Sequence, residues 1–356
     1  MSDPNQVSTK GAPVLEVDDL RTTFLTPRGP VRAVDGVSLR VAAGETVGIV
    51  GESGSGKSVF GRTAMGLISN GPTTEVTGRV SINGHDVHAM KPRDRRKLWG
   101  PEVAMVFQDP MTSLNPVKKV GTHLTETLRL HLKVGAKEAN ERAIDLLRQV
   151  FIPEPARRMK QYPHELSGGM RQRVVIAMAL ACDPKLLIAD EPTTALDVTV
   201  QKQILDLLAT LASERNMATI LVSHDLGAVE GRTDRVAVMY AGRTVETSKT
   251  SRVFNSPVHP YAEALLASIP RISDEPHTVL RAIEGTPPNM LIPPPGCRFA
   301  PRCRLAVDLC REESPELLEH GDGSGQQHLA ACHFPLVPAG SEVLVPAPGS
   351  AHEEVS

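Results

Sequence analysis

The sequence lacks long apolar runs, a secretory signal and an excess of charge of either sign. It has 356 residues, with 39 Lys or Arg and 41 Asp or Glu, so the formal net charge is −2. This balance gives no basic footprint of the kind that nucleic-acid binders show. No segment approaches the roughly 20 apolar residues of a membrane helix, and residues 1–13 are polar. We therefore expect a cytoplasmic protein that binds no nucleic acid.

Cysteine is also scarce, except near the end of the chain. Of the five cysteines, Cys182 stands alone in an apolar stretch, where a buried thiol that fills core space is the expected role. The others have the spacing C-x5-C-x6-C-x21-C and are Cys297, Cys303, Cys310 and Cys332. Stable disulfides are rare in the cytoplasm. Four clustered thiols there are more naturally a set of metal ligands than two disulfides.

The patterns that are present alternate between strand and helix. Segments with the periodicity or apolar run of a strand are 15–24, 31–41, 45–51 and 186–190. Residues 117–151 have apolar positions at helical spacing. This order predicts an α/β core with an antiparallel β part and a helical insertion at about 109–166. The proline density rises after Pro257, which indicates a second, small module.

A phosphate-binding loop is predicted between a strand and a helix. The stretch GESGSGKS fits the pattern G-x-x-x-x-G-K-[ST]. Its glycines let backbone N–H groups approach phosphate oxygens, and the following helix points its positive end at the same charge. Lys57 would reach the β- and γ-phosphates, and Ser58 would ligate Mg²⁺. The predicted nucleotide-binding residues of this loop are Gly51, Glu52, Ser53, Gly54, Ser55, Gly56, Lys57 and Ser58.

Two acidic residues follow a second apolar strand in the stretch LLIADE. The strand would bring Asp190 to its C-terminal end, where a carboxylate helps to hold Mg²⁺. Adjacent acids at the end of a buried strand are costly unless they meet a cation or a water to activate. We therefore expect Glu191 to be the catalytic base. No NKxD string for guanine recognition occurs, which argues against a GTPase.

A second anion site is predicted in LSGGMRQR, residues 166–173. Ser167 and the amides of Gly168 and Gly169 open a helix on a different surface from the first loop. One phosphate cannot occupy both sites within one molecule. The sequence therefore implies a head-to-tail dimer with ATP between the two subunits.

With these motifs the chain resembles the ATP-binding-cassette family. The resemblance implies roles for four further residues. Phe24 would stack on adenine, and Gln108 in VFQDP would contact Mg²⁺ and sense the permease. Asp197 in TALD would contact the opposite subunit, and His224 in LVSHD would hold the γ-phosphate and orient Glu191.

The resemblance narrows to the ATPase subunits of oligopeptide and dipeptide importers. It rests on FQDPMTSLNP, on Met170 in the LSGGMRQR stretch and on HPYAEALLASIP at 259–270. An amphipathic surface helix is an alternative for the last stretch. Related importers for nickel, glutathione or similar solutes have nearly the same ATPase. A soluble cassette ATPase of translation or DNA repair is a further alternative, although those usually carry two cassettes or a long coiled coil.

The resemblance also implies partners, location and domain organisation. The partners are a second cassette subunit (a paralogue or a second copy), two integral membrane permease subunits and, indirectly, an extracytoplasmic solute-binding protein. The location is peripheral, on the cytoplasmic face of the membrane. The segment after Gln108, about 109–121, should contact the permease through Pro110, Leu114 and Pro116. The predicted divisions are a flexible tail at 1–13, a nucleotide-binding domain at 14–256, a C-terminal module at 257–337 and a disordered tail at 338–356.

The cysteine cluster resembles the cysteine-bearing module of the same importers. Four thiolates are the usual ligands of a [4Fe–4S] cluster, and zinc ribbons usually have C-x2-C pairs that this tail lacks. We therefore expect an iron–sulfur cluster, with zinc (using His333 or His328) or unliganded or disulfide-bonded thiols as alternatives. Nearby arginines would offset the thiolate charge and are Arg298, Arg302, Arg304 and Arg311.

Overall fold

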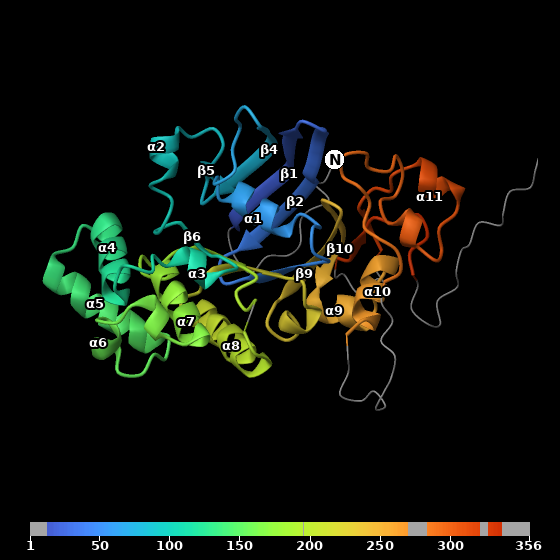
Figure 1. Cartoon of the computed structure of the whole chain (residues 1–356). Coiled ribbons are helices and arrows are strands. Elements are labelled where there is room, and N and C mark those ends of the chain that lie inside the picture. The colour runs from blue at the N-terminus through green and yellow to red at the C-terminus, as the bar shows by residue number, and fades with distance from the viewer. Residues whose placement is uncertain (1–12, 195, 270–282, 321–326, 337–356) are drawn as a thin grey trace, which may run out of the picture.

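The computed structural model describes residues 13–194, 196–269, 283–320 and 327–336. In this part of the chain two sheets share a core, and helices surround them (Figure 1). The larger sheet has the strand order β11-β12-β10-β9-β3-β8-β7-β6. Its strands are β3 (Thr46–Val50), β6 (Val103–Val106), β7 (Leu186–Asp190), β8 (Ala218–Ser223), β9 (Arg235–Tyr240), β10 (Arg243–Lys249), β11 (Leu318–Glu319) and β12 (Leu329–Ala330).

The centre of this sheet is parallel. Strands β9, β3, β8, β7 and β6 are parallel neighbours. Every residue of β6, β7, β8 and β9 is buried, as expected for strands covered on both faces. The carboxyl ends of parallel strands meet at one edge of the sheet, so the residues that follow β3, β6, β7 and β8 come together there.

The smaller sheet is antiparallel, with the order β2-β1-β4-β5. Its strands are β1 (Pro13–Thr26), β2 (Gly29–Ala42), β4 (Thr74–Ile82) and β5 (His85–Asp86). Asn83 and Gly84 join β4 to β5 with positive φ angles of 47° and 79°, as a two-residue hairpin turn requires. The buried face of this sheet packs with β3, β7 and helix α1 (Lys57–Ala64) in one apolar cluster.

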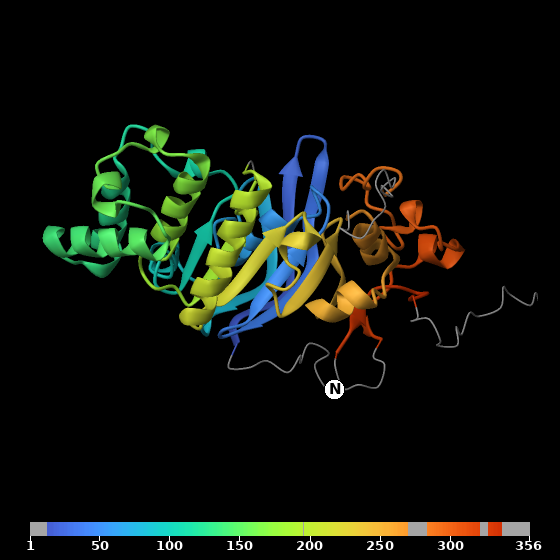
Figure 2. The same cartoon turned by 90° about the horizontal axis from the view of Figure 1, so that it is seen from below.

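Helices fill the interval between β6 and β7. They are α3 (Pro110–Ser113), α4 (Val120–Leu132), α5 (Ala136–Gln149), α6 (Pro155–Arg158), η1 (Pro163–Glu165) and α7 (Gly168–Ala179). The buried residues of α5 recur at helical spacing and are Ala139, Ala143, Leu146 and Leu147. Helices α4 to α6 form one end of the molecule, opposite the C-terminal segment (Figure 2). The interval 109–166 is thus helical, while its exact boundaries as a subdomain stay a prediction.

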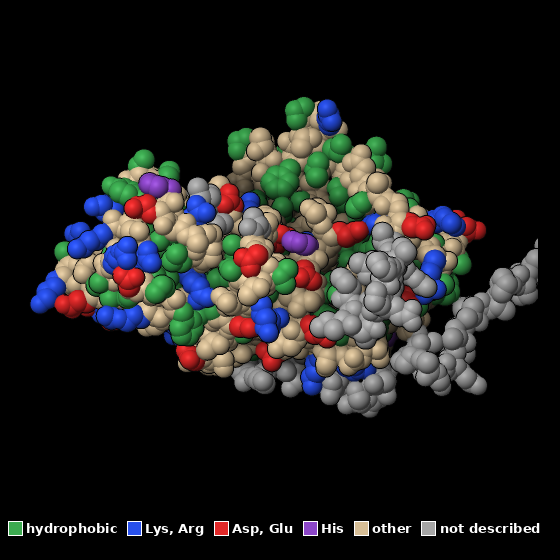
Figure 3. Space-filling view, turned by 60° about the horizontal axis from the view of Figure 1, so that its bottom comes forward, with side chains coloured by type: hydrophobic (Ala, Val, Ile, Leu, Met, Phe, Trp, Pro, Cys, Tyr) green, Lys and Arg blue, Asp and Glu red, His purple; other side chains and the backbone are tan. Residues whose placement is uncertain are grey.

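Other helices lie before β6 and after β7 in the described part of the chain. They are α2 (Pro92–Arg95), α8 (Val198–Glu214), η2 (Leu226–Ala228), α9 (Thr250–Asn255), α10 (Pro260–Ala267), η3 (Ala300–Arg302) and α11 (Asp308–Glu312). No helix in the described ranges is long and apolar enough to cross a membrane. Positive and negative side chains are interspersed on the face that Figure 3 shows.

The C-terminal segment extends the large sheet. Strand β12 pairs with β10, so that Ala330 lies opposite Glu246 and Leu329 opposite Thr247. The amide of Leu336 also donates to the carbonyl of Val258 at 2.8 Å. Hydrogen bonds to the core therefore hold this segment in place. The predicted tails, 1–13 and 338–356, lie outside the described residues except for Pro13, which begins β1.

Candidate active site

The phosphate loop joins β3 to α1 and needs glycine for steric reasons. Gly51 and Gly56 have φ angles of 151° and 101°. A Cβ atom on Gly51 would lie 2.1 Å from the carbonyl oxygen of Met239, and one on Gly56 would lie 2.3 Å from that of Ala33. Neither backbone oxygen can move away cheaply. The loop therefore takes this shape only with glycine at both positions.

Lys57 is the first residue of α1 and points back into the loop. Its side chain is buried, and Nζ donates to the carbonyl oxygens of Gly51 at 2.7 Å and Glu52 at 2.9 Å. Burial lowers the pKa of Lys57, and the carboxylates of Glu191, Asp190 and Glu52 oppose that shift. The positive charge is thus held inside the loop, where phosphate oxygens would lie.

Asp190 and Ser58 form the set of oxygen ligands expected for Mg²⁺. The Ser58 hydroxyl donates to Asp190 Oδ1 at 2.6 Å, and Arg62 Nη2 lies 3.5 Å from Oδ2. Asp190 is fully buried, and burial raises its pKa against the opposing hydrogen bond from Ser58. A nearby cation would remove the cost of burying this charge. Hydroxyl, carboxylate and amide oxygens from Ser58, Asp190 and Gln108 suit Mg²⁺.

Glu191 follows Asp190 and collects three hydrogen bonds on one carboxylate oxygen. Its Oε2 accepts from Gln108 Nε2 at 3.0 Å and Thr194 Oγ1 at 3.2 Å, and lies 3.0 Å from His224 Nδ1. The backbone of Glu191 has a φ of 46°, which turns the chain sharply at the end of β7. The sequence predicted Glu191, Gln108 and His224 as catalytic residues. It did not predict Thr194, for which the only indication was its position three residues after Glu191.

These residues surround one cavity of about 420 Å³. The lining residues come from the loop, from the ends of β6, β7 and β8 and from β2, and are Ala33, Ser53, Gly54, Gly56, Lys57, Ser58, Val59, Gln108, Glu191, Thr194 and His224. The parallel sheet explains most of this convergence, because the segments after β3, β6, β7 and β8 follow its carboxyl edge, while Ala33 comes from the antiparallel sheet. The cavity combines a phosphate loop with a carboxylate placed to activate water.

The predicted second anion site lies on another surface. Ser167 caps α7 by accepting from the amide of Met170 at 3.3 Å, and Asp197 caps α8 by accepting from Val200 at 3.0 Å. A Cβ atom on Gly169 would lie 2.7 Å from the Val200 side chain, and one on Gly168 would lie 3.3 Å from Leu196. These two motifs therefore lie side by side. Ser167, Gly168, Gly169 and Asp197 do not line the cavity that holds Lys57, although Thr194, the first residue of TALD, does.

Phe24 also lies away from the described lining of this cavity. It is half-buried on β1, opposite Val31 of β2 and Thr74 of β4. Its predicted contact with adenine stays a prediction.

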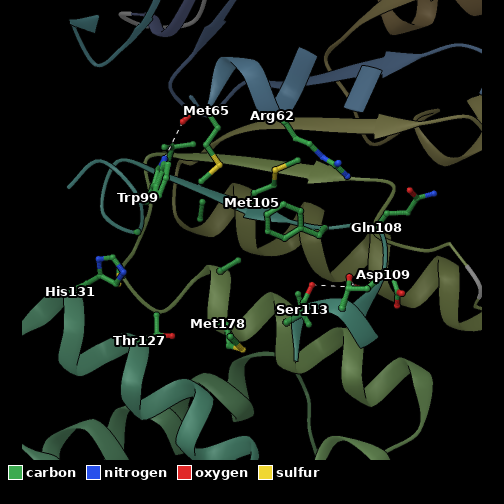
Figure 4. Close-up of a pocket in the computed structure, with 18 residues that line it drawn as sticks. Arg62, Met65, Trp99, Met105, Gln108, Asp109, Ser113, Thr127, His131 and Met178 are labelled. Carbon is green, nitrogen blue, oxygen red and sulfur yellow. Dashed lines mark hydrogen bonds between the residues drawn. The ribbon is translucent and has the colours of Figure 1, made fainter. Parts of the chain in front are cut away.

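A larger groove of about 730 Å³ lies on the other side of Gln108 (Figure 4). It separates the sheets from the helices of the insertion, and Trp99, the single tryptophan of the chain, lines it with its Nε1 bonded to the carbonyl of Met65 at 3.0 Å. Other lining residues are Arg62, Phe107, Asp109, Ser113, Thr127, His131 and Met178. Gln108 thus connects the active-site cavity to an open groove. No local sequence pattern points to Trp99 or His131, because the two residues meet only in the folded chain.

The C-terminal cysteines do not form a metal site. Cys297, Cys303, Cys310 and Cys332 lie around one cavity of about 20 Å³, roughly the space of a single water and too small for a cluster of iron and sulfur atoms. Across the described ranges, no group of three or more His, Cys, Asp or Glu side chains is arranged to hold a metal ion. The prediction of a [4Fe–4S] cluster is therefore wrong. Zinc, its alternative, has no support either.

Burial raises the pKa of the Cys297 and Cys303 thiols, and that of Cys332 to about 12. All the cysteines are free thiols. The arginines that were expected to offset thiolate charge pair with carboxylates instead. The pairs are Arg298 with Asp35, Arg302 with Glu52, Arg304 with Glu263 and Arg311 with Asp308.

A phosphate loop that faces an activating carboxylate across one cavity is what hydrolysis of a nucleoside triphosphate requires, so fold and site define a P-loop ATPase. Comparisons with known proteins narrow this class. The model of the ABC transporter family matches residues 34–194, and that of the oligopeptide/dipeptide transporter C-terminal region matches residues 245–310. The chain belongs to the ABC transporter family, among the ATP-binding proteins that carry this C-terminal region.

Two relatives and one solved structure illustrate the match. The oligopeptide transport ATP-binding protein OppD of Salmonella typhimurium is 52% identical over 303 residues, which cover 85% of this chain and 89% of OppD. The dipeptide transport ATP-binding protein DppD of Escherichia coli is 48% identical over 331 residues, which cover 93% of this chain and 99% of DppD. A dimeric, post-hydrolysis structure of the ATP-binding cassette MJ0796 with ADP and Pi has a TM-score of 0.60 and 27% identity and covers 66% of this chain and 98% of MJ0796.

Proposed function

We propose that this chain is the ATP-hydrolysing subunit of an importer for dipeptides or oligopeptides, peripheral on the cytoplasmic face of the membrane. The observation that carries the proposal is the position of Gln108. Its amide donates to Glu191 in the active-site cavity, and its side chain also lines the open groove beside Trp99. A residue that touches both cavities can transmit the state of the nucleotide to a partner in the groove. The names of OppD and DppD support peptides as the cargo.

In the hydrolysis step, each residue of the cavity has a distinct task. Glu191 accepts a proton from the attacking water, and Gln108, Thr194 and His224 hold its carboxylate. Lys57, oriented by the carbonyls of Gly51 and Glu52, would place its charge against the β- and γ-phosphates. Bound Mg²⁺ supplies charge neutralisation for the phosphates. Ser58 and Asp190, already in contact at 2.6 Å, hold its ligand shell together with Gln108.

The complete site needs a second cassette. Ser167, Gly168, Gly169 and Asp197 lie together on a surface away from Lys57, and the N-terminus of α7 would bind the γ-phosphate of an opposite subunit. Head-to-tail pairing brings this surface over the cavity of the partner. The dimeric state of the ATP-binding cassette MJ0796 supports this arrangement. The partner subunit is either a paralogue or a second copy of this chain.

The groove beside Gln108 is the proposed contact for a membrane permease subunit. With two cassettes in the assembly, each groove would bind one of the two permease subunits. A permease loop of suitable size would lie against Trp99, Phe107 and Met178, with the segment 109–121 at its rim. One expected contact is wrong, because Leu114 is only 2% exposed and packs inside the helical part. The exposed apolar residues there are Pro116 and Val117. The side chain of Pro110 lies outside the described residues.

The remaining parts of the proposal are the organisation of the chain and the periplasmic or extracellular partner. The nucleotide-binding domain is 14–256, and the C-terminal module is 257–337. The latter overlaps the matched C-terminal region at 245–310. A solute-binding protein outside the membrane would deliver peptide to the permease.

An uptake experiment tests the function. In a bacterial strain that lacks its own copy of the subunit, the wild-type chain should restore uptake of labelled di- and oligopeptides, and Glu191→Gln should not. Purification of the tagged chain from detergent extract should bring integral membrane subunits with it. If the chain restored uptake of nickel or glutathione but not of peptides, the proposed cargo would be wrong, while the role as an importer ATPase would stand. Purification without membrane proteins, together with no restored uptake, would reject the importer role.

A further inference from the structure

The phosphate loop is in direct contact with the C-terminal segment. Arg302 donates to both carboxylate oxygens of Glu52, at 2.6 Å to Oε2 and 3.0 Å to Oε1. The phenol oxygen of Tyr261 accepts a hydrogen bond from the backbone amide of Glu52 at 2.9 Å. Glu52 is the second residue of GESGSGKS, while Tyr261 and Arg302 are separated from it by 209 and 250 residues of sequence. Both bonds are thus long-range and meet at one loop residue.

Arg302 is held rigidly for this contact. Its side chain is only 3% exposed. It donates to the backbone carbonyls of Glu284 at 2.9 Å and Ile283 at 3.1 Å and to the Tyr240 hydroxyl at 3.3 Å, and its guanidinium lies 5.8 Å from the Tyr240 ring centroid. These contacts hold the guanidinium in one orientation. An arginine in a simple surface ion pair would contact only its carboxylate partner and would be free to move.

Tyr261 is equally fixed. It is fully buried, and its ring centroid lies 4.5 Å from that of Tyr240 and 5.3 Å from that of Phe299. Phe299 also packs edge-on against Tyr240 at 5.3 Å. This aromatic cluster (Tyr240, Tyr261 and Phe299) joins β9, α10 and the cysteine-rich stretch directly behind the phosphate loop.

Glu52 connects Arg302 and Tyr261 to Lys57. Its side chain is bound by Arg302 and its amide by Tyr261, while its carbonyl oxygen accepts from Lys57 Nζ at 2.9 Å. Glu52 does not line the cavity with Gly54 and Lys57, so it shapes the loop from behind. A shift of Glu52 would displace the carbonyl that orients Lys57. It would also change the curvature of the backbone that approaches phosphate.

On the basis of the proposed ATPase function, we propose that Arg302 and Tyr261 are positioning residues of the phosphate loop, which set its affinity for nucleotide through Glu52. The C-terminal segment is then part of the nucleotide-binding machinery as well as a structural extension. Loss of a buried, charge-assisted hydrogen bond typically costs about tenfold in an equilibrium constant or more. Arg302→Gln should therefore raise the Kd and KM for ATP about tenfold. The kcat should change less than about twofold, since Glu191 and His224 make no contact with Glu52.

The experiment uses the full chain and measures the Kd for fluorescent ATP and ADP analogues, together with KM, kcat and the unfolding midpoint. Tyr261→Phe keeps the ring and removes one acceptor, so it should weaken binding by a smaller factor of about three- to tenfold. Arg304→Gln is the matched control, because Arg304 lies two residues away and pairs with Glu263 on the surface. It should leave all four quantities unchanged.

A double-mutant cycle separates positioning from general stability. In a Glu52→Gln background, Arg302→Gln should have little further effect on the Kd, because its partner charge is already gone. An equal loss of affinity in both backgrounds would overturn the proposal. So would a lower unfolding midpoint with unchanged Kd and KM. Lys57→Ala distinguishes the two proposals. If it leaves nucleotide binding intact, the ATPase assignment fails. If it abolishes binding while Arg302→Gln leaves the Kd and KM for ATP unchanged, only the positioning role fails.

Discussion

At the scale of single residues, Glu191 is the position at which a substitution should affect ATP hydrolysis without affecting ATP binding. Its carboxylate is 12% exposed and receives hydrogen bonds on one oxygen from three side chains. None of these three side chains belongs to the phosphate loop, which we propose to bind the nucleotide together with Lys57.

Glu191→Gln should therefore keep ATP binding and stop turnover. The amide preserves the shape and loses the base, so kcat should fall by about 10²–10⁴-fold while the Kd for ATP stays within about threefold of wild type. Single-turnover hydrolysis and nucleotide-binding titrations measure the two quantities. Near-normal turnover in this variant would remove Glu191 from the mechanism.

Asp35 is the residue whose ionisation should control acid stability. Burial alone would raise its pKa, but Arg298, Arg243 and Arg21 together lower it below the usual value. Because the folded-state pKa is lower than that of the unfolded chain, the stabilisation is present above about pH 4 and is lost as the pH falls through the folded value.

Asp35→Asn should reduce the free energy of unfolding at pH 7 by about 3–5 kcal/mol, since it leaves the buried Arg298 without its countercharge. It should also flatten the loss of stability that the wild type shows as the pH falls below about 4. Urea unfolding at several pH values measures both effects. Asp308→Asn is the control, because that carboxylate is 91% exposed and should change stability by less than about 0.5 kcal/mol. An identical acid profile for wild type and Asp35→Asn would contradict the assignment.

At the scale of elements, the short helix α3 and the loop after it form the rim of the groove beside Gln108. The side chains of Pro116 and Val117 point to solvent, and Leu114 anchors the segment inside. This division leaves one surface free for a partner and keeps the other tied to α7.

Cysteines placed at Thr112, Pro116 or Val117 should crosslink to a cytoplasmic loop of a permease subunit in isolated membranes. The reason is that these exposed positions border the groove that Gln108 links to the nucleotide. Ile292→Cys, at an equally exposed site (81%) in the C-terminal segment, is the control and should not crosslink to the permease. If only Ile292→Cys crosslinked to the permease, the permease contact would lie on the C-terminal segment instead.

The elements that could be predicted from the sequence are those with local signals. The strand pattern and the glycine-rich loop depend on neighbouring residues, and the structure has them where they were expected. Strand β12 is only two residues long and pairs with β10 far away in the sequence, so no local pattern identifies it. The metal site predicted from the cysteine cluster is wrong because local spacing does not show what surrounds the thiols in the folded chain. The cysteine spacing fits a ligand set, whereas Arg298, Phe299 and Arg302 between the cysteines are the residues that bind the core.

At the scale of the whole molecule, the C-terminal segment and the cassette share one core. Phe299 is 3% exposed and belongs to the same apolar cluster as the helical insertion. The sequence suggested a second, small module after Pro257. In the structure, Phe299 of this segment packs on Tyr240 and Tyr261 of the cassette side.

Phe299→Ala should lower the free energy of unfolding of the entire chain by about 3–5 kcal/mol. If the core is shared, one transition will be seen by both far-ultraviolet circular dichroism and the fluorescence of Trp99, which lies in the distant groove. Val307→Ala, at an exposed site (45%) in the same segment, is the control and should have a small effect. A Trp99 transition that does not move in Phe299→Ala would indicate two independent units.

The pairing of β10 with β12 has a consequence for how the protein is made. Glu246 is fully buried and accepts hydrogen bonds from the amides of Val258 and His259, and His328 Nε2 completes its shell at 2.7 Å. His328 is 82 residues further along the chain, so at about 5–20 residues per second the ribosome delivers it roughly 4–16 s after Glu246. During that interval β10 is an open strand edge, able to pair with other chains. Translation that stalls between these two residues should therefore yield aggregates rather than a partly active ATPase.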